Sequence, residues 1–195
     1  MLLPFSAKGK RWEPHGQALR QLLSLAPHEL LDPFVLAEKV GLKLVDVCQL
    51  CEQLGSEFRK LVLVKDKDCW SGGVFARPLP DGKRVCILNS THGARRTKIT
   101  LMEEIAHVHL KHKPTGLMRS ADGLRMRNYD KTQEEDAYGV GAAALLPWAS
   151  FFKAINRGAT VNELANEYDL SEPLIRYRIQ ITGAHRLFHA RQQGR

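Results

Sequence analysis

Several features that would narrow the function of a protein are missing from this sequence. No apolar run reaches the roughly 18 residues that a membrane-spanning helix needs, and the apolar start of the chain, Met1–Phe5, is too short for a signal peptide. Internal repeats and low-complexity tracts are also absent. We therefore expect a cytoplasmic protein that does not enter a membrane.

Cysteine is scarce, with four residues in a chain of 195. Cys48 and Cys51 have the C-x-x-C spacing of zinc and redox sites, but a second such pair is absent, and Cys69 and Cys86 are far apart in sequence. In a cytosolic chain this pattern favours reduced, partly buried thiols over a structural zinc.

Positive charge, in contrast, is in excess, with a net charge of +8 and a pI of about 9.5. Such a balance permits binding to nucleic acid or to an acidic partner, but it does not demonstrate either. The apolar content of 44% suffices for a buried core. A chain of this length suits one domain with an appendage or two small domains.

Hydrophobic periodicity and turn residues predict a mostly helical chain with a few strands. Around Pro80-Asp81-Gly82 the chain has strong turn chemistry, which predicts a hairpin. We expect a loose arm at residues 1–11 and a mobile loop at 115–131 that could gate a cleft. The expected helices cover residues 14–25, 34–40, 48–54, 93–111, 133–146, 148–156, 160–168 and 171–182, and the expected strands 42–47, 59–64, 69–78 and 83–88.

The C-terminal region has the pattern of a helix-turn-helix segment. Thr160 and Glu163 form a capping box, and Ser171 can cap the following helix after a short turn. Arg176 and Arg178 are candidate DNA contacts, but they point to different sides of an unusually apolar helix, which favours docking over groove binding. We therefore predict two units, 1–147 and 148–195.

Candidate chemistry is concentrated in the helix predicted at 93–111, which Ser90 or Thr91 can cap. Its residues Glu103 and His107 are four apart and so share one helix face, with Glu104 between them. This is the spacing of the H-E-x-x-H motif, in which two histidines bind zinc and the glutamate is the general base. Here Glu103 takes the place of the first histidine.

A third metal ligand has to come from another element. Asp136, near the start of the helix predicted at 133–146, is the best candidate. The glycines and alanines of that helix allow close packing beside the first helix, which offsets a cost of up to about 1 kcal/mol for each glycine. His109 and His112 are expected to face the surface or a loop.

Two segments of the chain together resemble the ImmA/IrrE family of metallopeptidases. Residues 100–107 read T-L-M-E-E-I-A-H where the family has T-L-A-H-E-L-G-H. Residues 134–147 read E-E-D-A-Y-G-V-G-A-A-A-L-L-P where the family has E-x-E-A-N-x-F-A-A-x-L-L-M-P. The family's third ligand is the acidic residue directly before the alanine, which implies Glu103, His107 and Asp136 as ligands and Glu104 as the catalytic base.

The resemblance implies an α+β fold: a predominantly helical zincin-like domain with a small antiparallel sheet, followed by the helix-turn-helix-like segment. Family members cleave helix-turn-helix repressors and so release stress-response or mobile-element genes. The resemblance thus implies a metal-dependent endopeptidase with a repressor as its protein substrate and zinc as the first choice of divalent metal. No membrane partner is expected, because the chain has no long apolar run. DNA is the less favoured partner.

Glu103 is the main departure from the family pattern. Two carboxylates and one imidazole bring the metal and its ligands to a net charge of zero, which lowers the pKa of bound water less than two histidines and one carboxylate do. An oxygen-rich set also shifts the preference toward manganese or iron. Three outcomes stay open: an active variant, a catalytically inactive module that binds a regulatory protein or DNA, and an amphipathic helix whose acids merely face water.

Overall fold

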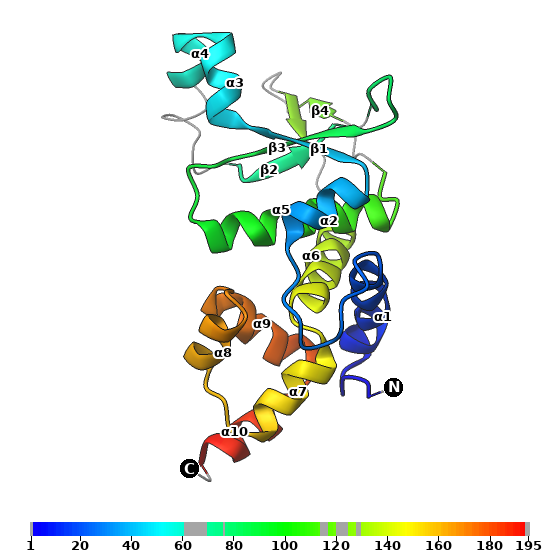
Figure 1. Cartoon of the computed structure of the whole chain (residues 1–195), viewed down its shortest axis with the longest axis vertical. Helices are drawn as coiled ribbons and strands as arrows, with labels where there is room; N and C mark the ends of the chain where they lie inside the picture. Colours follow the sequence, from blue (N-terminus) through cyan, green and yellow to red (C-terminus); the bar gives the residue numbers. More distant parts are fainter. Residues whose placement is uncertain are drawn as a thin grey trace.

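The computed structural model describes residues 2–60, 70–75, 77–113, 117–119, 125–127 and 130–193. Figure 1 shows the strands with α3 and α4 at one end of the molecule and α7–α10 at the other. The elements are α1 (Ala7–Gln21), α2 (Pro33–Lys39), β1 (Leu42–Asp46), α3 (Val47–Leu54), α4 (Ser56–Lys60), β2 (Gly72–Val74), β3 (Arg84–Leu88), α5 (Ala94–His109), β4 (Leu117–Arg119), β5 (Arg125–Arg127), α6 (Lys131–Leu145), α7 (Trp148–Asn156), α8 (Val161–Glu167), α9 (Glu172–Thr182) and α10 (His185–Gln193).

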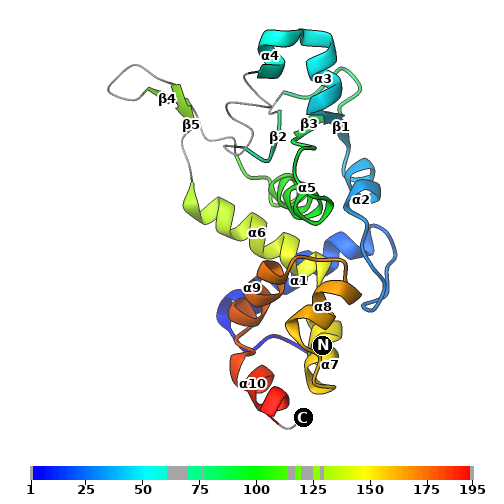
Figure 2. The same cartoon turned by 90° about the vertical axis from the view of Figure 1, so that its left-hand side faces the viewer.

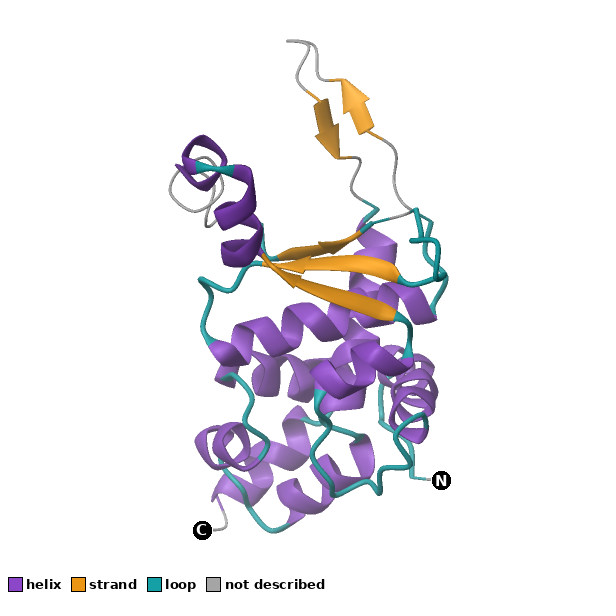
Figure 3. Ribbon diagram, turned by 45° about the horizontal axis from the view of Figure 1, so that its top comes forward, coloured by secondary structure: helices purple, strands orange, loops and turns teal. Residues whose placement is uncertain are grey.

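The main sheet has the strand order β1-β3-β2. β2 and β3 form the predicted hairpin, whose turn places Gly82 at a φ of +81°, a conformation that glycine adopts without strain. β1 runs parallel to β3, so the sheet is mixed and not wholly antiparallel as expected. Figure 3 shows these strands lying across the helices, with the separate β4–β5 hairpin projecting away. The predominantly helical α+β class is confirmed.

Below the sheet the helices are stacked in layers, with α5 under β2 and β3, α6 under α5, and α1 against α6 (Figure 2). Glycines allow the close approaches. A Cβ atom at Gly139 would lie 2.3 Å from the Trp12 ring, and one at Gly141 would lie 3.2 Å from the Met102 backbone. The prediction that small residues let another helix approach α6 closely is therefore confirmed, and it applies to two neighbouring helices.

Replacing Gly139 with alanine is expected to lower the free energy of unfolding by about 1–3 kcal/mol, because the added methyl group collides with the buried Trp12 ring. The gain in helix propensity offsets only about 1 kcal/mol of this. Urea denaturation followed by circular dichroism measures the effect. Gly73→Ala is the matched control, since nothing lies within 4 Å of its added Cβ; equal losses for the two variants would contradict the packing argument.

The N-terminal region differs from its expected form. Residues 7–11 belong to α1 and not to a loose arm, because Ser6 caps the helix by accepting the Gly9 N–H at 2.9 Å. Trp12 then inserts into the core with 1% of its surface exposed. Burial of the Trp12 ring thus fixes the position of a helix whose first residues are polar and basic in sequence.

Three other predictions differ from the structure, and one of them falls partly outside the described residues. Residues 59 and 60 end α4 and are not in a strand, while the rest of the strand predicted at 59–64 lies outside the described residues. α5 begins after Gly93 without a side-chain cap, so neither Ser90 nor Thr91 caps it. The stretch predicted as a loop at 115–131 contains β4, β5 and the start of α6.

The C-terminal helices share the core of the rest of the chain. Buried Trp12, Leu36, Phe151 and Ile175 all belong to one hydrophobic cluster, which includes residues on both sides of Pro147. The division into 1–147 and 148–195 stays a prediction. The predicted capping box at the start of α8 is present.

Among the described residues, no single helix is long and apolar enough to cross a membrane. α6 and α7 reach the length and apolar composition of a membrane-spanning helix only when they are taken together, and the chain bends by 62° between them. The apolar residues of α6 are buried in the protein core.

Candidate metal centre

Three side chains from two helices converge beneath the sheet. Glu103 and His107 come from α5 and Glu134 from the first turn of α6, and each offers one ligand atom within 4.8 Å of the others. His107 Nε2 lies 3.3 Å from Glu134 Oε2. All three residues are half-buried, so the cluster is shielded but open to a small ion.

Local structure explains how Glu134 reaches this place. Asp130 caps α6 by accepting the N–H groups of Thr132 and Gln133, and these bonds lower the pKa of its carboxyl. Glu134 and Gly141 are seven residues apart and thus on one helix face. The close approach of Gly141 to Met102 therefore brings Glu134 against α5.

Asp136, the predicted third ligand, lies elsewhere. Its Oδ1 accepts a hydrogen bond from Trp12 Nε1 at 2.8 Å and is paired with Arg11, so it faces α1. Side chains two positions apart in a helix differ by about 200° around its axis, which explains why Glu134 and Asp136 face different neighbours. Within the described part of the chain, the structure brings Glu134, and not Asp136, to Glu103 and His107.

Glu104 lies beside this cluster with 9% of its surface exposed. Its Oε2 accepts the Val74 N–H at 3.1 Å. Val74 is on β2. The next residue, Phe75, donates its N–H to β3, so the Val74 N–H points away from β3 and toward α5. Sequence spacing placed Glu104 near the ligands, but only the fold supplies this backbone donor.

A cleft of about 620 Å³ opens beside these residues. Glu104, His107 and Glu134 contribute to its wall, and Val74 and Phe75 place the edge of β2 along it. The cleft is therefore bordered by two of the three candidate metal ligands, a buried carboxylate and a strand edge, which are parts that hydrolysis of an extended peptide needs. Glu103 lines a separate, smaller pocket with Thr100 and Tyr138.

The three cysteines that the structure describes do not join this cluster. Burial, together with the charge of Glu104, raises the pKa of the Cys86 thiol to about 12, so it stays protonated at neutral pH. Cys48 and Cys51 are free, with Cys48 exposed and Cys51 buried. Cys69 lies outside the described residues.

His112 was missed as a site residue. It lies in the loop after α5, is half-buried and lines the same cleft, and its Nδ1 lies 2.9 Å from His107 Nδ1. Burial, followed by the charge of His107, lowers the pKa of His112. His109 lies apart from this group, with its Nε2 at 3.4 Å from His15 Nδ1. Periodicity gave no signal for His112, because it follows the end of α5.

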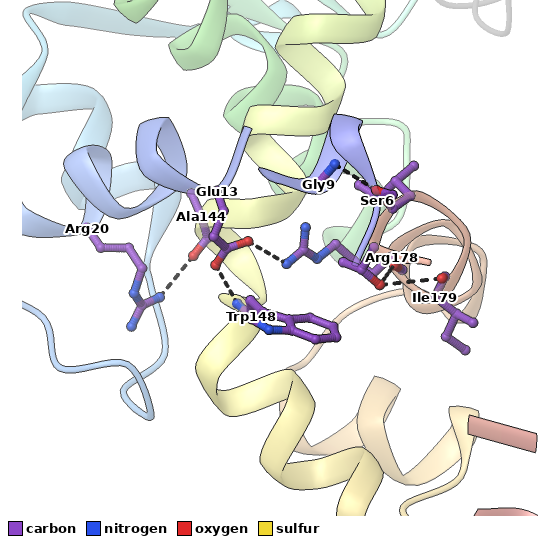
Figure 4. Close-up of polar contacts among 10 residues, drawn as sticks. Ser6, Gly9, Glu13, Arg20, Ala144, Trp148, Arg178 and Ile179 are labelled. Atoms are coloured by element: carbon purple, nitrogen blue, oxygen red, sulfur yellow. Dashed lines mark hydrogen bonds and ion pairs between the residues drawn. The ribbon is translucent and has the colours of Figure 1, made fainter. Parts of the chain in front are cut away.

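The arginines of the helix-turn-helix-like segment have different environments. Arg178 is fully buried and donates to Glu13 Oε2 at 3.0 Å (Figure 4). Arg176 is exposed and paired with Glu172. Arg178 thus anchors α9 to α1 and is not available to DNA. DNA binding by the protein stays a prediction.

Comparison with protein families adds a decisive observation. The sequence model of the Peptidase_M78 family, described as the IrrE N-terminal-like domain, matches residues 65–180, which is more than half of the chain. The chain belongs to this family. The IrrE N-terminal-like match includes α5 and α6, and hence all the residues of the candidate metal centre, whereas α1 precedes it. Searches of curated proteins and of solved structures gave no match.

The resemblance drawn from residues 100–107 and 134–147 is thereby confirmed. The protein carries a metallopeptidase-like domain, and membership of the family implies a divalent metal. The donors present fit such an ion, because two carboxylates and an imidazole lie close enough to share it and leave further coordination positions open.

Proposed function

We propose that the protein is a metal-dependent endopeptidase whose metal is held by Glu103, His107 and Glu134. The observation that carries this proposal is the convergence of these three donors within 4.8 Å, with His107 and Glu134 at the wall of a cleft next to the buried carboxylate of Glu104. Catalytic zinc sites have three protein ligands and an open position. Glu134 thus takes the role first assigned to Asp136.

A divalent ion bound there would supply Lewis acidity and lower the pKa of water. Glu104 is the general base in this proposal, and the Val74 N–H holds its carboxylate at the cleft wall. Glu103 and Glu134 offset both positive charges of the ion, which weakens its polarising effect compared with a two-histidine set and makes manganese or iron acceptable beside zinc.

The substrate class follows from the family resemblance, which points to a helix-turn-helix repressor. An extended segment of such a protein could align with the edge of β2, where main-chain hydrogen bonding gives affinity without strict sequence dependence. Incubation of the protein with a purified repressor and Zn²⁺ or Mn²⁺, with and without a chelator, tests this. Cleavage that the chelator abolishes is the expected result; cleavage that persists in the chelator would exclude a metal-dependent reaction.

Variants of α6 decide which carboxylate is the third ligand. Glu134→Gln is expected to lower the affinity for Zn²⁺ by more than about 100-fold, since loss of a direct ligand should exceed the effect typical of supporting residues. Asp136→Asn is expected to leave it within about threefold, because the amide oxygen can still accept from Trp12 Nε1. Competition with a chromogenic chelator measures both constants. The opposite order of effects would restore Asp136 as the ligand.

A further inference from the structure

The chain turns back just after α5 and places a second histidine on the first. The His112 N–H donates to the His107 carbonyl at 3.0 Å. The two imidazole rings then meet edge to face, with their centroids 4.9 Å apart and their Nδ1 atoms 2.9 Å apart. A backbone hydrogen bond and a contact between the rings thus both hold His112 beside His107.

The two ring nitrogens of His107 have different neighbours. Nε2 lies on the side of Glu134, at 3.3 Å from its Oε2, whereas Nδ1 faces His112. A histidine that binds a metal through one nitrogen carries its proton on the other and usually donates that proton to a nearby acceptor. Two neutral imidazoles at hydrogen-bonding distance satisfy this only when one ring donates and the other accepts.

We propose that His112 is a positioning residue for the metal centre. It accepts a hydrogen bond at Nδ1 from His107 Nδ1–H, which fixes the His107 tautomer and directs the lone pair of Nε2 toward Glu103 and Glu134. The inference rests on the proposed function, because it assigns to His107 the role of a ligand. His112 itself does not contact the metal in this arrangement.

The departure at Glu103 makes this role more important here. His107 is the single imidazole among the three donors, so the orientation of one ring sets the nitrogen contribution of the site. Without an acceptor at Nδ1, His107 could carry its proton on Nε2 and present no lone pair to a metal. His112 supplies that acceptor from the residues directly after α5, without using another helix.

The test compares metal affinity in three variants. His112→Leu removes the acceptor and is expected to lower the affinity for Zn²⁺ by about 10- to 100-fold, as loss of such supporting groups does elsewhere. His112→Asn keeps an oxygen near the place of Nδ1 and is expected to bind within about threefold of the unchanged protein. His109→Leu is the matched control, since His109 faces His15. Equal affinity of the unchanged protein and His112→Leu would overturn the inference.

A second measurement separates positioning from simple packing. The ¹⁵N spectrum of the histidine side chains in the zinc-bound protein is expected to show His107 protonated at Nδ1, with that proton protected from exchange with solvent. The protection is expected to be lost in His112→Leu but not in His112→Asn. A proton found on His107 Nε2 in the zinc-bound, unchanged protein would overturn the inference. The thermal midpoint of each zinc-free variant shows whether it is folded, so that a lost site is not mistaken for a lost fold.

Failure of the inference and failure of the proposed function give different results. If the unchanged protein binds Zn²⁺ and loses it in His107→Leu and Glu134→Gln, but His112→Leu has no effect, only the role of His112 is wrong. If Zn²⁺, Mn²⁺ and Co²⁺ all fail to bind the unchanged protein, or bind independently of His107, both proposals fall.

Discussion

Replacing Glu104 with glutamine is expected to abolish peptide cleavage and leave zinc binding unchanged. A positioned general base contributes about 10²- to 10⁴-fold to rate, and glutamine cannot accept the proton. Its amide oxygen can still accept from the Val74 N–H, so the cleft wall should keep its shape. The rate of cleavage of a mixed fluorogenic peptide library, measured with Zn²⁺ and then with Mn²⁺, gives the effect.

Glu135→Gln is the control for this experiment, because Glu135 is exposed and pairs with Lys8 outside the metal centre. It is expected to cleave at the rate of the unchanged protein. Undiminished cleavage by Glu104→Gln would remove Glu104 from the mechanism. A protein that binds a repressor tightly but never cleaves it, with or without metal, would instead be the non-catalytic module of the alternative hypothesis.

Replacing Arg178 with methionine is expected to cause the largest loss of stability, about 3–5 kcal/mol in the free energy of unfolding. Arg178 and Glu13 are both fully buried and bonded to each other, and Glu13 also accepts the Trp148 N–H (Figure 4). Removing the guanidinium leaves the Glu13 carboxylate buried beside one backbone donor. Urea denaturation measures the change.

The charge pair itself, and not the shape of Arg178, should account for this loss. Arg178 Nε and Nη1 have no hydrogen-bond partner among the described residues, so the guanidinium is incompletely satisfied. The double variant Glu13→Gln with Arg178→Met removes both charges and is expected to be more stable than Arg178→Met alone. Arg176→Met, at an exposed pair, should change stability by less than about 0.5 kcal/mol. Similar losses at Arg176 and Arg178 would contradict this account.

These contacts give α1 a structural role that the family match does not include. α1 holds α9 through Glu13, and it holds α6 through Trp12 and Asp136, two residues from Glu134. The N-terminal helix thus braces the element that presents the third donor. Residues 7–11 of this helix were predicted to belong to a loose arm, because residues 1–11 are polar and basic in sequence.

The sequence by itself determined the local parts of the site. Glu103, Glu104 and His107 lie within five residues of one helix, so their relative placement follows from helix geometry alone. Turn and cap chemistry at the β2–β3 hairpin and α8 is equally local, and both were predicted. The family followed from two short segments, since their residues could be compared position by position.

Tertiary structure decided everything that joins distant segments. Glu134 and Asp136 differ by about 200° around one helix, and packing against α5 and α1 determines which one meets His107. The same holds for His112, which the chain turns back onto His107 after α5 ends, and for Arg178, which looked like a candidate DNA contact until Glu13 was found beside it. Such contacts depend on distances between separate elements, and residue spacing along one element carries no information about them.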